Sequence, residues 1–423
     1  MSVFAHKKKP NESVALAFVG SIVPDKPAFY NAGFSRAGNM FQENLLRAMQ
    51  DIGFSPSLIL SQRPLPALPK SSTIWAKRRR VEVADGLPVY LVPFLNLPFL
   101  RPLTVGLAVL LGLLQWGYRS RKAPYKVVLT YNLTEPAGVF TLIGSRLIGA
   151  RAVATVIDIN IPGQTVPVTL PRCLDFELQK RLIPQFDGLI VISKRIVEHF
   201  APGKPFVRVE GGVNEAVLRH FATLPRKLTG ALPFTIVSAG SLDEANGYIE
   251  LLEAFSLLRG DNYRLRIAGV GPLQDRVEQA AVADPRIEYL GYLTFDQVLA
   301  LYDTADLLIN MRLTQRLDTT YFFPSKMMEY LASGVPVITT CPGHVEEEYA
   351  DIAFLLREET PQALAQIIAQ VAAMPADLRI QKGLAAQAYI QAHNSWRTQG
   401  RRVVEFICHQ VLHLDYMGNK IEH

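Results

Sequence analysis

The sequence predicts an α/β fold made of two parallel sheets, each covered by helices on both faces. At 423 residues the chain exceeds one ordinary hydrophobic core, which favours two domains of about 200 residues each. A hydrophobic content of 49% is enough to fill two such cores. Short continuous apolar runs also alternate with helical stretches, as in parallel strands buried on both faces.

The first half opens with a strand, loop, helix and strand. Val14 to Val19 is predicted to be a buried strand, followed by a Gly/Asn-rich loop from Asn31 to Asn39. An amphipathic helix is expected from about Met40 to Asp51, closing at Gly53. The remaining apolar runs of this half are expected to continue the sheet, namely Ser57 to Leu60, Lys126 to Thr130, Ala152 to Ile157 and Gly188 to Ile192.

Leu103 to Tyr118 is an almost wholly apolar segment between two basic runs, residues 77–80 and 119–122. Its sixteen residues would extend about 24 Å as a helix, short of a bilayer core of about 30 Å. Pro93, Pro98 and Pro102 are expected to loosen its approach. We interpret the segment as a helix of the first domain. The alternative is a surface helix whose basic flanks face anionic lipid.

A link from about Leu224 to Pro233 is predicted to separate the halves. The second half repeats the strand and helix alternation. Strands are predicted at Phe234–Ala239, Tyr263–Ala268 and Leu307–Asn310, and a helix at Gly247–Leu258. From about Pro361 the chain is expected to be helical to its end. The predicted domains are residues 1–225, 226–395 and a final helix over 396–423 that packs back on the first domain.

Composition excludes several classes of protein. The net charge of +6 is spread among interspersed acidic residues, which suits an anionic ligand or membrane surface better than nucleic acid. Cys173, Cys341 and Cys408 form no CxxC pair, which argues against a disulfide framework and a zinc site and favours a reducing cytoplasm. The polar first twelve residues do not resemble a secretory signal.

Several well-known catalytic and cofactor-binding motifs are absent from the sequence or incomplete in it. Gly269-Val270-Gly271 follows a strand, but the third glycine of a dinucleotide fingerprint is replaced, so we reject an NAD site. HExxH, GxSxG and phosphate-loop lysine motifs do not occur in the sequence. The lone histidines His199, His344 and His393 are expected to be surface or packing residues, and Asp303 and Asp306 a helix-end pair, so no metal site is predicted.

The run from Phe322 to Ile338 is the most informative part of the sequence. Pro324 is expected in the first turn of a short helix, which Gly334 and Pro336 end. Free N–H groups and the macrodipole at its start, near Ser325 and Lys326, would favour a phosphate. Glu329, one turn later, could accept hydrogen bonds from two ribose hydroxyls. The alternative is a capped helix of any α/β domain.

The second half contains a series of motifs that resembles the donor-binding domain of GT-B glycosyltransferases, specifically the large retaining group called family 4. These motifs are Ser238-Ala-Gly240-Ser-Leu242 with Gly247, Leu251-Leu-Glu-Ala254, Ile267-Ala-Gly-Val-Gly-Pro272, Arg286-Ile-Glu-Tyr-Leu-Gly291, Leu301-Tyr-Asp-Thr-Ala-Asp-Leu307 and the run from Pro324 to Ile338. The first half is similar more loosely, through the glycine loop near Gly33 and Gly38, Thr155-Val-Ile-Asp158, Ile190-Val-Ile-Ser193 and Glu210-Gly-Gly-Val-Asn214. The resemblance implies a GT-B fold, with two Rossmann-like domains facing across a cleft. It also implies that the first domain, residues 1–225, binds the acceptor and that the second, residues 226–395, binds the nucleotide sugar.

The chain departs from the family pattern at the donor site. The Arg and Lys that usually hold the diphosphate are replaced by Ser241-Leu242 and Asn246, and the usual sugar-binding Glu by Tyr321. The active-site His of the first domain is replaced by Ile157. Three cations on one loop and helix offer a replacement for the missing pair, namely Arg312, Arg316 and Lys326. Some exopolysaccharide-type members of the family share this arrangement.

The resemblance therefore implies transfer of a hexose-type sugar from a nucleotide diphosphate sugar to a glycan or lipid-linked acceptor, with retention. No metal and no cofactor is expected. Asp158, Arg312 and Lys326 are the predicted catalytic residues. The predicted donor-binding residues are Gly33, Gly240, Ser241, Asn246, Gly269, Tyr292, Leu293, Arg316, Tyr321, Ser325 and Glu329.

The expected location is the cytoplasm, with peripheral contact at the inner face of the plasma membrane. A catalytically silent subunit that binds a partner glycosyltransferase or a glycan is the main alternative, because the usual side chains are missing. A sugar-nucleotide epimerase on the same fold is a more distant one.

Overall fold

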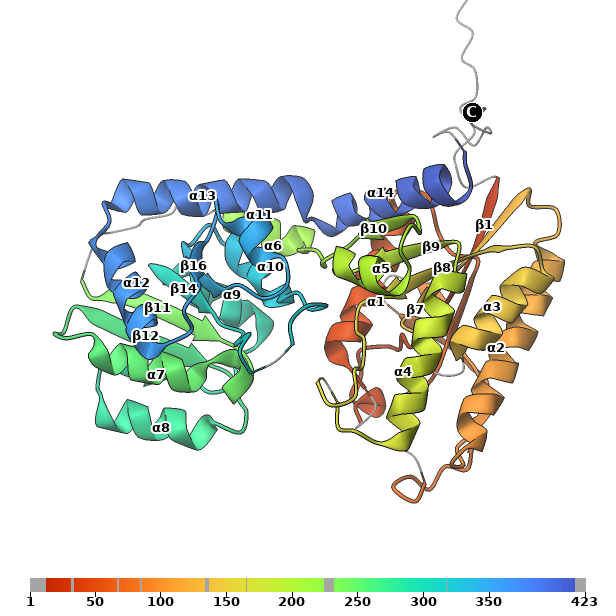
Figure 1. Cartoon of the computed structure of the whole chain (residues 1–423), viewed down its shortest axis with the longest axis horizontal. Helices are drawn as coiled ribbons and strands as arrows, with labels where there is room; N and C mark the ends of the chain where they lie inside the picture. The colour runs from red at the N-terminus through yellow and green to blue at the C-terminus, as the bar shows by residue number, and fades with distance from the viewer. Residues whose placement is uncertain are drawn as a thin grey trace, which may run out of the picture. The chain divides into compact units, whose positions relative to one another are not determined.

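The structure is a computed structural model that describes residues 13–31, 34–66, 68–83, 86–133, 137–164, 166–223, 232–316 and 318–414. The chain splits into two compact units: unit 1 comprises residues 1–209 and 396–423, and unit 2 comprises residues 210–395 (Figure 1). Each unit holds one large sheet whose neighbouring strands are mostly parallel. The predicted α/β class with two parallel sheets is confirmed.

The sheet of unit 1 has eight strands in the order β10-β9-β8-β7-β1-β2-β5-β4. All neighbours pair in parallel except β4 and β5, which are antiparallel. The strands are β1 (Val14–Gly20), β2 (Leu58–Ser61), β4 (Arg79–Val83), β5 (Leu87–Leu91), β7 (Tyr125–Tyr131), β8 (Arg151–Val156), β9 (Gly188–Val191) and β10 (Phe206–Arg208). A separate antiparallel pair joins β3 (Trp75–Ala76) to β6 (Phe94–Leu95).

The helices of unit 1 are α1 (Arg36–Asp51), α2 (Leu100–Arg119), α3 (Ala137–Leu147), α4 (Leu170–Leu182), α5 (Lys194–Phe200) and α14 (Trp396–Phe406), which a π-turn extends over Ile407–Val411. Helices α2 and α3 lie side by side (Figure 1). They approach closely because Gly106 faces Phe140 and Gly144 faces Leu113. Helix α14 packs within unit 1, where it contacts α1.

Two helices of unit 1 are longer than the sequence predicted. Helix α1 begins at Arg36 rather than near Met40, because the Ser35 hydroxyl accepts a hydrogen bond from the N–H of Gly38 and caps the helix. Helix α2 has 20 residues rather than sixteen, since Pro102 lies in its first turn, where a proline is tolerated. The predicted loosening at Pro102 is therefore wrong. Among the described residues, α2 is the one helix long and apolar enough to cross a membrane.

The sheet of unit 2 has six parallel strands in the order β13-β12-β11-β14-β15-β16, the strand order of a Rossmann fold. The strands are β11 (Phe234–Ala239), β12 (Tyr263–Ala268), β13 (Ile287–Tyr289), β14 (Leu307–Asn310), β15 (Val337–Thr340) and β16 (Phe354–Leu356). The helices are α6 (Glu215–Thr223), α7 (Tyr248–Leu257), α8 (Gln274–Ala283), α9 (Phe295–Asp303), α10 (Ser325–Ala332), α11 (Val345–Tyr349), α12 (Pro361–Ala373) and α13 (Ala376–His393).

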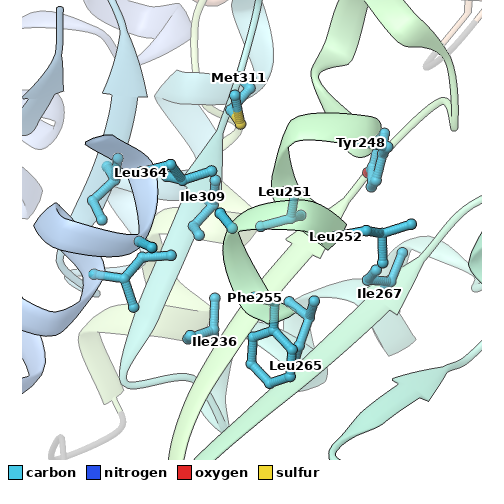
Figure 2. Close-up of a cluster of buried hydrophobic side chains, with 14 of the residues drawn as sticks. Ile236, Tyr248, Leu251, Leu252, Phe255, Leu265, Ile267, Ile309, Met311 and Leu364 are labelled. Carbon is cyan, nitrogen blue, oxygen red and sulfur yellow. The ribbon is translucent and has the colours of Figure 1, made fainter. Parts of the chain in front are cut away.

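A buried apolar cluster joins the helices of unit 2 to its sheet. Figure 2 shows Leu251, Leu252 and Phe255 of α7 near Ile236 and Leu265 of the strands below. Helix α12 packs beside α7 and adds Leu364 to the same cluster. This packing holds the carboxyl ends of the unit 2 strands, and the loops that follow them, in fixed positions on the sheet.

The first predicted domain boundary differs from the structure. The division falls between Val209 and Glu210 rather than after residue 225, while the second falls at Ser395 as expected. Helix α6 lies in unit 2 because it packs on α10, and because the His220 side chain pairs with Asp303 at 2.9 Å. Most of the predicted link, residues 224–231, lies outside the described residues.

Candidate active site

Unit 2 has its topological switch point between β11 and β14, where the strand order reverses. Ligands of open α/β sheets bind at the carboxyl ends of the strands beside such a point. Gly240 follows β11 there, Arg312 follows β14 by two residues, and α10 starts nearby with Ser325 and Lys326. The structure therefore brings these four predicted site residues to one edge of one sheet.

Lys326 reaches the end of β11 from the first turn of α10. Its Nζ donates a hydrogen bond to the carbonyl of Ala239 at 2.5 Å. The Tyr330 hydroxyl accepts from the Ala239 N–H at 2.8 Å, so two side chains of one helix hold this strand end. Burial lowers the pKa of Lys326, and the nearby Glu329 opposes that shift. The sequence did not identify Tyr330, which is buried and lies 91 residues from its partner.

Glu329 lies one turn after Lys326 on the same helix and is half-buried. Burial raises the pKa of its carboxyl, while Lys326 acts in the opposite direction. Within the part of the chain that the structure describes, no group donates a hydrogen bond to this carboxylate. Its oxygens are thus available to accept hydrogen bonds from a ligand, as the sequence predicted for a ribose.

The backbone of Arg312 is fixed by a hydrogen bond, and its side chain is partly buried. Its N–H donates to Thr340 Oγ1 at 2.8 Å, and its guanidinium lies over the Phe322 ring at 5.0 Å. One guanidinium nitrogen donates to Asn246 Oδ1 at 3.3 Å, whereas Nε is buried without a hydrogen-bond partner among the described residues. Burial is the main cause that lowers the pKa of Arg312. No carboxylate of the described residues forms an ion pair with it, a state that favours an anionic ligand.

Asn246 stands where the resembling family usually has a lysine, and the structure uses it to order the loop. Its Nδ2 donates to the Ser241 carbonyl at 3.0 Å and to Asp243 Oδ2 at 3.1 Å. Because its Oδ1 accepts from Arg312, Asn246 joins the loop after β11 to the cation after β14. The Ser241 side chain is exposed beside it.

Arg316 differs from the other two cations. Its guanidinium forms ion pairs with Glu250 at 2.6 Å and with Glu244 at 3.6 Å. A guanidinium already neutralised by carboxylates attracts a phosphate less than an unpaired one. The predicted donor contact of Arg316 therefore stays a prediction with less support than those of Arg312 and Lys326.

The glycines of the site are explained by close backbone contacts. A Cβ on Gly269 would lie 1.8 Å from the Gly240 carbonyl oxygen, and Gly269 has a φ of +137°. A Cβ on Gly271 would lie 2.4 Å from the carbonyl oxygen of Leu242. Gly269 and Gly271 therefore let the loop after β12 approach the loop after β11.

The other predicted donor residues lie around this edge. Tyr292, which is 67% exposed, and Leu293 follow Gly291, whose carbonyl accepts from the N–H of Gly269 at 2.8 Å. Tyr321 is half-buried in the segment before α10. Pro324 is the residue that directly precedes α10, one position earlier than the first-turn placement predicted from sequence.

The predicted residues of the first half belong to unit 1. Asp158 is exposed two residues after β8, and its N–H donates to Asn132 Oδ1 at 3.4 Å. Desolvation raises the pKa of Asp158, while a side-chain hydrogen bond with Asn132 opposes the shift. Ile157, which replaces the usual histidine, is buried. Gly33 lies outside the described residues.

One group of side chains was missed because its members are far apart in sequence. Glu210, His344 and Glu348 bring their ligand atoms within 4.8 Å of one another, an arrangement that could hold a metal ion. The His344 ring is hydrogen-bonded to Glu210, and the Tyr349 hydroxyl donates to the same carboxylate at 2.5 Å. His344 is buried, as a packing histidine was expected to be, but it does not stand alone.

The comparisons with known proteins agree with this fold. Residues 233–374 match the sequence model of the family described as "Glycosyl transferases group 1". HepE from Anabaena, solved in complex with UDP, superposes with a TM-score of 0.63 at 16% identity, covering 93% of this chain and 99% of that one. Sucrose-phosphate synthase from Thermosynechococcus elongatus superposes with a TM-score of 0.62 at 14% identity, covering 92% and 98%. The class of fold is thus defined: the chain has a GT-B fold, and residues 233–374 of its unit 2 match the glycosyl transferase group 1 model.

Two curated relatives refine the resemblance. The putative colanic acid biosynthesis glycosyltransferase WcaL of Escherichia coli is 30% identical over 168 residues, which is 38% of this chain and 41% of that protein. The amylovoran biosynthesis glycosyltransferase AmsK of Erwinia amylovora is 27% identical over 191 residues, or 43% and 46% of the two chains. The matched region spans less than half the length of each of these relatives.

Proposed function

We propose that this protein transfers a hexose-type sugar from a nucleotide diphosphate sugar to a glycan or lipid-linked acceptor in the biosynthesis of a bacterial exopolysaccharide. One observation carries the proposal. At the switch point of unit 2 lie two partly buried cations, Arg312 and Lys326, and neither is hydrogen-bonded to a carboxylate of the described residues. They accompany Glu329, whose carboxylate accepts no hydrogen bond from the described residues and is available to a ligand. This set suits a diphosphate attached to a ribose. The relatives WcaL and AmsK, which are named as polysaccharide biosynthesis glycosyltransferases, support the same substrate class.

The chemistry assigns a role to each group. The bond between the anomeric carbon and the diphosphate breaks, and the nucleoside diphosphate leaves with the electron pair. The acceptor hydroxyl oxygen bonds to the anomeric carbon, and its proton passes to an oxygen of the departing diphosphate. Arg312, Lys326 and the first-turn N–H groups of α10 would stabilise the developing charge on the diphosphate, without the need for a metal. Glu329 would accept from the ribose hydroxyls, the Gly291 to Leu293 backbone would line the base, and Asp158 would face the acceptor. Retention at the anomeric carbon belongs to the same proposal.

The proposal includes a cytoplasmic location with peripheral contact at the inner face of the plasma membrane. Helix α2 supports it, since exposed leucines occupy one side of this helix while basic runs precede and follow it. Its other side packs into unit 1 through Val105, Val109, Leu113 and Trp116. A helix anchored on one side by a protein core suits surface contact better than insertion across a bilayer.

The alternative is a catalytically silent subunit, favoured by the replacements at Ile157, Ser241, Asn246 and Tyr321. A panel of nucleotide diphosphates and their sugar conjugates, screened by thermal shift and then by turnover, tests both readings. Ligand at 100 times its dissociation constant should stabilise the fold by about 2.7 kcal/mol. We expect one base to shift the melting temperature and its sugar conjugate to be consumed when an acceptor is present. Stabilisation without consumption of any sugar nucleotide would favour the silent subunit, and no stabilisation by any nucleotide would contradict the proposed donor site.

A further inference from the structure

Three side chains of metal-ligating type, Glu210, His344 and Glu348, meet within unit 2. One ligand atom from each residue lies within 4.8 Å of those of the other two. His344 directly precedes α11, and the N–H of Glu348 donates to its carbonyl at 3.3 Å. Residues four apart in a helical turn are neighbours, so these two side chains lie on one face. Glu210, the first residue of unit 2, completes the group from a distant part of the sequence.

The His344 ring is buried and has one nitrogen that the protein does not use. The side chain is 1% exposed, and Nε2 is hydrogen-bonded to Glu210. Nδ1 is buried without a hydrogen-bond partner among the described residues. In the neutral ring Nε2 carries the proton of the bond to Glu210, which leaves Nδ1 with a buried, unsatisfied lone pair. A buried polar atom of this kind points to a missing ligand.

The Glu210 carboxylate is oriented by donors to its second oxygen. The Tyr349 hydroxyl donates to Oε2 at 2.5 Å, and Asn394 Nδ2 donates to the same oxygen at 3.5 Å. These donors hold Oε2, whereas Oε1 faces the His344 ring. Outer donors that fix a carboxylate in this way are typical of metal sites, where they orient the ligands. Glu348 is half-buried, so the group is accessible from solvent.

We propose that Glu210, His344 and Glu348 bind a divalent transition-metal ion such as Zn²⁺. Two carboxylates at this distance repel each other, and a divalent cation between them replaces the repulsion by attraction. One imidazole with two carboxylates suits Zn²⁺ or Mn²⁺ better than Ca²⁺ or Mg²⁺, which prefer oxygen ligands. Three protein ligands leave a further position for a water molecule.

The ion would have a structural role that is independent of the proposed transfer reaction, since none of its three ligands is a predicted donor residue. It would join the first residue of unit 2 to α11. The Phe323 ring stacks on the His344 ring with 5.1 Å between centroids, so the ion would also brace the segment that leads into α10. Gly343 packs against the same segment, because a Cβ there would lie 2.4 Å from the Phe322 carbonyl oxygen.

The test measures metal binding by the full-length, tag-free protein after treatment with a chelator. Calorimetric titration should give one Zn²⁺ per chain, with Mn²⁺ roughly tenfold weaker and Ca²⁺ roughly 100-fold weaker. Co²⁺ should bind with visible absorption bands, and Zn²⁺ should displace it. Zn²⁺ at about 100 times its dissociation constant should raise the melting temperature of unit 2 by roughly 5–10 °C.

Substitutions separate ligands from the donors that orient them. His344→Gln and Glu348→Gln each remove a ligand and should weaken Zn²⁺ binding by roughly 100-fold or more, whereas Tyr349→Phe removes only a donor to Glu210 and should weaken it by about tenfold. Glu348 is the half-buried ligand, so its variant keeps the test decisive if His344→Gln does not fold.

Matched controls come from neighbouring residues outside the group. Glu347→Gln changes the exposed carboxylate next to Glu348, and Cys341→Ser removes a half-buried thiol near His344. Both variants should bind Zn²⁺ as the wild type does. A wild type that binds neither Zn²⁺ nor Co²⁺, or binds Ca²⁺ as tightly as Zn²⁺, would overturn the inference. Zn²⁺ binding that Glu348→Gln leaves unchanged would overturn it as well.

Discussion

Gly240→Ala tests whether Lys326 must lie where the structure has it. A Cβ on Gly240 would lie 2.6 Å from Lys326 Nζ, about 1 Å closer than an ordinary contact, and 3.6 Å from the Tyr248 hydroxyl. The ammonium group must therefore shift, and we expect it to lose its bond to the Ala239 carbonyl. The backbone at Gly240 does not need the left-handed conformation, so alanine adds no strain there.

The expected cost follows from two opposing effects. Loss of a hydrogen bond from a charged group costs about 1.5–3 kcal/mol, and the reduced freedom of the unfolded chain returns about 0.4–1 kcal/mol. The net loss of about 0.5–2.6 kcal/mol corresponds to a fall of roughly 1–10 °C in the melting temperature of a unit this size. If the ammonium also contacts the diphosphate, affinity for the nucleoside diphosphate should fall by roughly 10- to 150-fold.

Calorimetric titration and thermal denaturation of a double-mutant cycle provide the assay. In a Lys326→Ala background the added methyl meets no ammonium, so Gly240→Ala should then change nucleotide affinity less than twofold. Gly138→Ala is the control, because its Cβ would meet only ordinary contacts of 3.4 Å or more. Wild-type affinity in Gly240→Ala, or an equal loss with and without Lys326, would refute the placement of this ammonium at the phosphates.

Three further predictions concern the donor site and the surface of unit 1. Glu329→Gln should weaken nucleotide-sugar binding by about 1.5–3 kcal/mol in calorimetry without unfolding the protein, because the amide is a poorer acceptor for two hydroxyls. Unchanged affinity for every nucleotide sugar would exclude Glu329 from the donor site. Arg312→Ala and Lys326→Ala should each lower turnover about 100-fold or more. Arg316→Ala should lower turnover less, because Glu250 already pairs with the Arg316 guanidinium. Wild-type rates in the Arg312 and Lys326 variants would mean that the phosphates lie elsewhere. Co-sedimentation with vesicles should require anionic lipid and should decrease as salt is added. Replacing Arg78, Arg79, Arg119 or Arg121 should each weaken binding to anionic vesicles by roughly 1 kcal/mol. Equal binding to neutral vesicles would contradict this surface docking.

Local sequence patterns were sufficient for the framework of unit 2. Phe234–Ala239, Tyr263–Ala268 and Leu307–Asn310 were predicted with the bounds that the structure has, since each is a short apolar run between turn residues. Lys326 and Glu329 were identified for the same reason, because their spacing on one short helix is visible in the sequence. Arg312 was found by its place after a predicted strand.

Features that depend on distant residues were not predicted. Strands β4 and β5 were also missed, because the segment that contains them is rich in proline and arginine and its pattern does not alternate clearly. The Glu210 carboxylate meets the His344 ring across 134 residues, and Tyr330 meets Ala239 across 91. Pairings of this kind are decided by tertiary packing, for which a single sequence carries no local signal.

The most direct measurement for the central claim is a crystal structure of this protein with the nucleoside diphosphate that stabilises it most. We predict that the diphosphate lies at the start of α10 within hydrogen-bond distance of Lys326 and Arg312, and that the ribose hydroxyls donate to Glu329. A nucleotide bound away from the carboxyl ends of β11 and β14, or a ribose that does not contact Glu329, would contradict the account.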